Sequence, residues 1–144
     1  MKISLTGGNG FVGSHILEVL LEMQAQVTLL LRPGADLSFI RNHLTDANVH
    51  LGGLDDTKFL ANAVDGADAV IHCAGKTKAL HTKEYNTVNC DGTKNIVAAA
   101  NTHRDSIKHF IYISSLAVSG PGDRQNPARE DNPPHRKLPP NIAE

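Results

Sequence analysis

KISLTGGNGFVG, residues 2–13, joins a short apolar stretch to a glycine-rich turn and then to the start of an amphipathic segment. Gly8, Gly10 and Gly13 satisfy the G-x-G-x-x-G pattern, in which glycines permit a tight turn, close backbone approach to a pyrophosphate and close helix packing. A helix beginning near Phe11 would direct its unpaired N–H groups and positive dipole end at that turn. The predicted phosphate site consists of Gly7, Gly8, Asn9, Gly10, Phe11, Val12 and Gly13.

The flanking residues favour this interpretation over an ordinary glycine-rich turn, which the pattern alone describes about as well. Ile3 and Leu5 give an apolar strand before the turn, and apolar residues recur at helical spacing after it. A second strand is expected at residues 27–31. The sequence therefore predicts nucleotide or dinucleotide binding.

Strands and helices alternate along the rest of the chain, which predicts an α/β fold with a doubly wound, Rossmann-type parallel sheet. Right-handed crossovers from a central first strand favour the strand order 3-2-1-4-5. Further strands are expected through Val49 and Leu51, at residues 69–73 and at residues 109–114. Helices are expected at residues 36–43, after an N-cap at Asp55 or Asp56, and at residues 82–101.

Composition favours one domain, with the cofactor fold at residues 1–120 and a proline-rich, irregular or disordered tail at residues 121–144. The net charge of -1, with 14 basic and 15 acidic residues intermixed, argues against a nucleic-acid surface. Cys73 and Cys90 are too few for a disulfide framework, and no apolar run approaches the roughly 20 residues that span a bilayer. We therefore expect a cytoplasmic protein without a signal peptide or a membrane partner.

The eight histidines do not occur at the spacing of metal ligands, so no metal site is predicted. The end of the second predicted strand bears on the cofactor. An acidic residue in this region would bind the ribose 2′-hydroxyl of NAD, whereas an arginine accommodates the 2′-phosphate of NADP. Arg32 stands there, so NADP is favoured and NAD stays open; the alternative is an exposed arginine before the Pro33-Gly34 turn.

In an open α/β sheet, ligands bind beyond the carboxyl ends of the strands, which places Ala74, Gly75 and the loop at residues 76–81 beside the glycine turn. The loop's basic side chains would attract an anionic substrate or simply face solvent. Asn89 and Asn95 are poor residues for a helix interior, which indicates that at least one has a specific contact.

Four segments carry a family resemblance: TGGNGFVG at residues 6–13, HCAG at 72–75, VNCDGTKN at 88–95 and YISSLAV at 112–118. Together they resemble the extended short-chain dehydrogenase/reductase family, the group of NAD(P)-dependent sugar epimerases/dehydratases and dihydroflavonol-reductase-like enzymes. The resemblance extends from residue 2 to about residue 120. It implies that Cys73, Ala74, Gly75 and Ser114 border the cofactor, that Asn89 ties its helix to the sheet, and that Ser115 is the active-site serine.

Two features depart from the family pattern. Gly53 replaces the acid that contacts adenine, which would leave adenine recognition to the backbone at Leu54. The family's Tyr-x-x-x-Lys pair, its general acid/base, is absent: the residues four beyond Tyr85 and Tyr112 are Asn89 and Leu116. We therefore expect either an amino-terminal portion of a longer enzyme or a short product that has lost the reaction.

The leading functional hypothesis is the NAD(P)-binding domain of an epimerase/dehydratase or reductase acting on a nucleotide-sugar or similar carbonyl/alcohol substrate, not competent for turnover as the chain stands. The alternative is a non-catalytic dinucleotide-binding sensor or interaction protein. Without the Tyr-x-x-x-Lys helix, we expect an exposed apolar side on residues 82–101 that favours a homodimer. This side would consist of Val88, Ile96, Val97 and Ala100.

Overall fold

The computed structural model describes residues 1–133 and contains one five-stranded parallel sheet with the order β3-β2-β1-β4-β5, which confirms the predicted fold. The strands are β1 Lys2–Thr6, β2 Gln26–Leu31, β3 Asn48–Leu51, β4 Ala69–His72 and β5 His109–Tyr112. The last two end one and two residues earlier than the sequence indicated. Their carboxyl ends meet at one edge of the sheet, where ligands of such folds bind.

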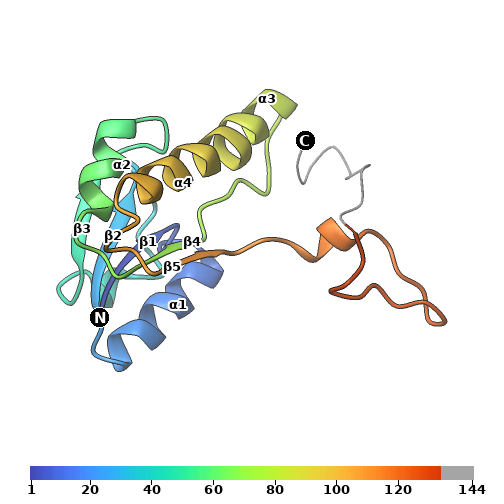
Figure 1. Ribbon diagram of the computed structural model, residues 1–144, viewed down its shortest axis with the longest axis horizontal. Coiled ribbons are helices and arrows are strands. Elements are labelled where there is room, and N and C mark those ends of the chain that lie inside the picture. Colours follow the sequence, from blue (N-terminus) through green and yellow to red (C-terminus); the bar gives the residue numbers. More distant parts are fainter. Residues whose placement is uncertain (134–144) are drawn as a thin grey trace.

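Helices lie on both faces of the sheet (Figure 1). Helix α1, Phe11–Glu22, covers one face, and α2, Thr57–Val64, lies beside α4, Gly92–Thr102, on the other. Asp56 is the N-cap of α2, as predicted, because its side chain accepts a hydrogen bond from the amide of Phe59 at 2.9 Å.

Alternating strand side chains divide the core into two layers. Leu5, Leu29 and Ile71 pack with Leu17 of α1 on one face of the sheet. On the other face, a second cluster joins Leu30 and Val70 to residues of α2 and α4, namely Leu60, Ala63, Val64, Ile96, Ala99 and Ala100. Each fully buried leucine or isoleucine contributes about 1.5 to 3 kcal/mol of hydrophobic free energy. Burial on both faces is why the central strands are almost entirely apolar.

The turn between β1 and α1 depends on two glycines. Gly7 has φ +70°, and a Cβ on it would lie 2.5 Å from the amide nitrogen of Ala74. A Cβ on Gly13, in the first turn of α1, would lie 2.0 Å from the carbonyl oxygen of Gly7. The tight turn is therefore made by Gly7, one residue before the G-x-G-x-x-G pattern, and Gly13 allows α1 to start directly against it.

The prediction of a helix at residues 36–43 is wrong, because only a 3₁₀ turn at Arg41–His43 forms. The side chain of Asp36 accepts a hydrogen bond from the Ser38 amide at 2.9 Å, and such local bonds compete with a helix. The carbonyl of Asp36 also accepts a hydrogen bond from the side-chain amide of Asn9 at 3.0 Å. This segment is therefore attached to the glycine turn.

The helix expected at residues 82–101 is interrupted. A short α3, Thr82–Tyr85, leads into a π-helical segment, Asn86–Asp91, and only then into α4. π-Helical segments are rare, and those that occur are frequently found at functional sites. The prediction that this helix exposes an apolar side is wrong for Ile96 and Ala100, which are buried in the core against α2. They are unavailable for a contact with a second copy.

Residues 121–133 contain no helix or strand and form an irregular segment, in which the Asp123 carboxylate accepts hydrogen bonds from the amides of Gln125 and Asn126. In Figure 1 the stretch after β5 runs away from the sheet. The boundary at residue 120 stays a prediction, and the tail residues from 134 onward lie outside the described residues.

We predict that Gly13→Ala destabilises the protein by about 2 kcal/mol, although alanine is intrinsically better in a helix by about 1 kcal/mol. The new methyl group would overlap the Gly7 carbonyl, so the helix or the turn must shift. Gly10→Ala is the matched control, because its nearest contact would be an ordinary 3.4 Å. Denaturant unfolding measures both; a Gly13→Ala variant as stable as Gly10→Ala contradicts the prediction.

Candidate functional site

A cavity of about 480 Å³ opens at the carboxyl edge of the sheet, between the glycine turn and the loops that follow β2, β3 and β4. The sequence-predicted site residues that line it are Gly7, Asn9, Gly10, Arg32, Leu54, Cys73, Ala74 and Gly75. The structure therefore brings together residues from four separate loops.

Other predicted residues lie elsewhere. Gly8 and Gly13 pack inside the turn, and Asn89 lies behind the cavity wall. Phe11 and Val12 are exposed on α1, where they border a separate surface hollow together with His15, Ile16, Val19 and Leu20. Ser114 and Ser115 follow β5, are exposed and do not line the cavity.

The glycine turn has the chemistry that a pyrophosphate requires. Helix α1 begins after Gly10, whose backbone is extended and provides no side-chain cap. The first N–H groups of a helix have no acceptor within it, and the helix dipole favours an anion there. A Cβ on Gly10 would meet only the Gly7 carbonyl, so the space in front of this turn is open. These residues fit a phosphate group.

Two charged side chains line the cavity. Arg32 follows β2, and Asp55 lies in the loop after β3. Within residues 1–133, the structure shows no hydrogen bond or ion pair for either the Arg32 guanidinium or the Asp55 carboxylate. Both groups are therefore available to a ligand.

The loop after β3 is held in place by α4. The side-chain amide of Asn95 donates a hydrogen bond to the carbonyl of Leu54 at 2.8 Å. The Leu54 side chain packs against Gly92, where a Cβ would lie only 2.9 Å from a Leu54 methyl carbon. Asn95 and Gly92 therefore fix the cavity wall opposite the glycine turn.

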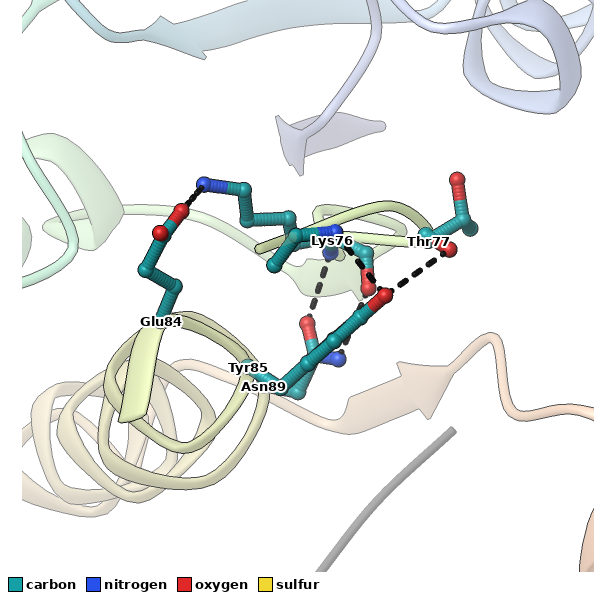
Figure 2. Close-up of polar contacts among 6 residues, drawn as sticks. Lys76, Thr77, Glu84, Tyr85 and Asn89 are labelled. Carbon is teal, nitrogen blue, oxygen red and sulfur yellow. Dashed lines mark hydrogen bonds and ion pairs between the residues drawn. The ribbon is translucent and has the colours of Figure 1, made fainter. Parts of the chain in front are cut away.

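The loop after β4 is held by Asn89 of the π segment, as Figure 2 shows. Its side-chain oxygen accepts from the Lys76 amide at 2.7 Å, and its side-chain nitrogen donates to the Lys76 carbonyl at 3.0 Å. The Tyr85 hydroxyl accepts from the Ala79 amide at 2.8 Å. The sequence expectation that an asparagine in this helix has a specific contact is met at both Asn89 and Asn95.

Lys76 also forms an ion pair with Glu84 of α3 (Figure 2), and this partner lowers the pKa of the Glu84 carboxyl. Its ammonium group is therefore engaged within the protein. This contact leaves Lys76 less suited to attract an anionic substrate than the sequence allowed.

A buried histidine connects the two halves of the site. His72, at the end of β4, is completely buried. Its Nδ1 lies 2.6 Å from the Thr6 hydroxyl, and its Nε2 lies 2.9 Å from the Thr93 hydroxyl. Its ring stacks on Tyr112 at a centroid distance of 5.6 Å. His72 therefore joins the end of β1, next to the glycine turn, to the start of α4.

The positions of the protons around the His72 ring follow from the other hydrogen bonds that Thr93 and Thr6 make. The Thr93 hydroxyl donates to the Asn89 carbonyl at 2.6 Å, so its oxygen accepts from His72 Nε2–H. His72 Nδ1 then accepts from the Thr6 hydroxyl, whose oxygen accepts from the Ala74 amide at 3.2 Å. All four bonds require a neutral imidazole, and burial lowers the pKa of His72 to about 4.

Several cavity residues were not predicted from the sequence, namely Thr6, Leu30, Gly52, Asp55, Phe59 and Thr87. From the sequence, Asp55 was interpreted only as a helix cap and Val88 as part of an exposed dimer surface. Both residues line the cavity. The position of Asp55 in the loop that follows β3 was the signal that could have identified it.

Within residues 1–133, no group of three or more His, Cys, Asp or Glu side chains gathers as a metal site. No helix in this part of the chain has both the length and the apolar character to cross a membrane.

Comparison with known proteins gives a consistent match. A sequence profile described as the 3-beta hydroxysteroid dehydrogenase/isomerase family covers residues 4–141. The sterol-4-alpha-carboxylate 3-dehydrogenase (decarboxylating) of Dictyostelium discoideum is 33% identical over 135 residues, which cover 92% of this chain and 40% of that protein. Uncharacterized protein 052L of Frog virus 3 is 36% identical over 125 residues, or 84% of this chain and 35% of the relative.

A solved structure has the same fold. The enzyme WbmH of Bordetella bronchiseptica, in complex with NAD⁺, superposes with a TM-score of 0.80 at 27% identity. The match covers 93% of this chain and 46% of WbmH. The chain therefore spans less than half the length of these relatives.

We predict that His72 makes stability depend on pH. Its pKa is lower in the folded protein, about 4, than the ordinary 6.5, so its contribution is complete above pH 6.5 and is lost as the pH falls toward 4. Between pH 7 and pH 5 the free energy of unfolding should fall by about 2 kcal/mol relative to His72→Gln. Urea unfolding at both pH values measures this difference.

Removing any histidine could in principle change the pH dependence of stability. The exposed His50 therefore provides the matched control for the buried His72. His50→Gln should retain the pH dependence of the unmodified protein. An unchanged gap between the protein and His72→Gln at the two pH values would contradict a neutral, buried imidazole.

Proposed function

The chain belongs to the 3-beta hydroxysteroid dehydrogenase/isomerase family, and we propose on that premise that its residues 1–120 bind NAD(P) for an oxidoreductase or epimerase/dehydratase reaction. The observation that carries the proposal is the uncapped start of α1, which lies beside Gly7 and Gly10 at a cavity of about 480 Å³. Such a helix start binds a pyrophosphate through backbone N–H groups.

The other cavity residues support the same assignment. Arg32 would contact the adenosine ribose or its 2′-phosphate, and the backbone at Leu54 would contact the adenine end. Cys73, Ala74 and Gly75 would border the cofactor from the other side of the glycine turn. Asn89 acts on this wall indirectly, because it positions the main chain of Lys76.

We propose NADP over NAD for this chain. WbmH was solved with NAD⁺, which supports a nicotinamide dinucleotide but not this preference. The preference rests on Arg32, whose guanidinium has no partner in the described part of the chain and can pair with a phosphate in two parallel hydrogen bonds.

The bound nicotinamide would supply hydride transfer to or from a carbon that carries a hydroxyl or carbonyl group. Ser115 would hold that oxygen by a hydrogen bond, and Ser114, which follows β5, would lie next to the cofactor. Because no Tyr-x-x-x-Lys occurs in this sequence, these residues contain no general acid/base of the family type. We therefore propose cofactor binding without turnover for the chain by itself.

The substrate class proposed is a nucleotide-sugar or another carbonyl/alcohol compound; the relative from Dictyostelium discoideum is named for a sterol carboxylate. A homodimer stays a prediction, although Ile96 and Ala100 cannot contribute to it. A cytoplasmic location is part of the proposal and is supported by the free thiols of Cys73 and Cys90, which suit a reducing compartment.

We predict that NADPH binds and that Gly10→Ala weakens its binding at least about tenfold, since a methyl group there holds the phosphates away from the helix start. The variant should fold normally because the added carbon meets nothing closer than 3.4 Å. Calorimetric titration of the full chain is the measurement. If NADPH does not bind to the unmodified chain, the proposed function is wrong.

We predict further that NADPH binds about tenfold more tightly than NADH, and that Arg32→Gln abolishes this preference by weakening NADPH alone. The matched control is Arg41→Gln, which removes the same charge from the exposed Arg41 in the 3₁₀ turn. Fluorescence titration of both cofactors gives the ratio. Equal affinities for the two cofactors in the unmodified chain would refute the role of Arg32.

A further inference from the structure

We propose that the Asp55 carboxylate accepts a hydrogen bond from the exocyclic amine of the cofactor's adenine. It would thereby replace the side chain that Gly53 lacks. This inference rests on the proposed function, because it assigns one end of the same dinucleotide. It adds a specificity-determining side chain to a region where the sequence offered only the backbone at Leu54.

The order of the strands places Asp55 at the adenine end. Neighbouring strands lie about 4.8 Å apart, so the loop after β3 is about 10 Å from the glycine turn, with the end of β2 between them. The pyrophosphate belongs at the glycine turn and the adenosine ribose near the residue after β2. The base therefore extends toward the loop that contains Asp55.

The position of the carboxylate is specific. A Cβ built on Gly53 would lie 2.1 Å from Asp55 Oδ1. The Asp55 oxygen thus occupies the space into which a side chain at position 53 would project. The absence of a side chain at Gly53 is what makes room for Asp55 in this conformation.

A structural role does not account for this carboxylate. The N-cap of α2 is Asp56, whose side chain accepts from the Phe59 amide, so Asp55 is not required for capping. Among residues 1–133, no donor bonds to its side chain. The carbonyl of Leu54, by contrast, already accepts from Asn95. Asp55 therefore provides a side-chain acceptor with unused capacity in this part of the cavity.

The surrounding side chains suit a flat base with a polar edge. Phe59 and Leu54 line the same part of the cavity, and Phe59 packs so closely over Gly52 that a Cβ there would lie 2.3 Å from the ring. A carboxylate repels phosphates, so in a cavity for an anionic ligand it must face the part of that ligand that donates hydrogen bonds. The amine of adenine is such a donor.

The test compares NADPH with its hypoxanthine analogue, in which an oxygen replaces the adenine amine. The unmodified full chain should bind NADPH about tenfold more tightly, since a hydrogen bond to a charged group has about this effect. Asp55→Asn should reduce the ratio of the two affinities to near one, because an amide can donate to the analogue's oxygen as well as accept. Calorimetric titration gives both affinities.

Two further variants make the result specific. Asp46→Asn removes one negative charge at another exposed aspartate and should leave the ratio unchanged. Asp55→Ala should lose the discrimination, and adding Gly53→Asp to it should restore the discrimination, because the space at position 53 is then free. This rescue would not follow from a general effect on folding.

The outcomes separate the two proposals. If NADPH binds and Asp55→Asn leaves the affinity ratio unchanged, or weakens both ligands equally, the inference about Asp55 is wrong while the proposed function stands. If neither ligand binds the unmodified chain, the proposed function fails, and the inference fails with it.

Discussion

The close contact between Gly13 and the carbonyl of Gly7 is the constraint on which the rest of the site depends. A Cβ at Gly13 would lie 2.0 Å from that oxygen, so α1 can begin at the end of β1 only because the side chain is absent. The contact directs the start of the helix at the carboxyl edge of the sheet. The loops after β2, β3 and β4, together with residues of α2 and of the π segment, meet this helix start across the same cavity.

The helical segment from Asn86 to Thr102 fixes those loops relative to one another. Asn89 holds the main chain after β4, Thr93 binds the buried histidine that reaches β1, and Asn95 holds the loop after β3. The spacing of these three residues therefore has a physical explanation. Asn89 and Asn95 each hold main-chain atoms at the cavity, whereas Thr93 holds the side chain of His72, so each polar residue in this helix has a specific contact.

The site combines a part built from backbone with a part built from side chains. Near Gly7 and Gly10, the helix start provides N–H groups that suit any pyrophosphate, so this region is expected to contribute affinity without much selectivity. Toward β2 and β3, Arg32 and Asp55 present one positive and one negative charge without internal partners in the described residues. Selectivity among dinucleotides is therefore expected at that end.

The sequence by itself determined the strands and the position of the glycine turn, because hydrophobic periodicity and glycine geometry are local properties. The strand order followed from the right-handed crossovers that alternating strands and helices require. The sequence also indicated a specific contact for an asparagine of the helix expected at residues 82–101, which Asn89 makes, and it predicted Arg32 near the ligand edge of the sheet, where Arg32 lines the cavity. Only the tertiary structure decided the π segment, the burial of Ile96 and the place of Asp55 in the cavity. These depend on contacts between residues far apart in the chain, such as Leu54 with Asn95, and no local pattern specifies which side chain fills a space left by a glycine.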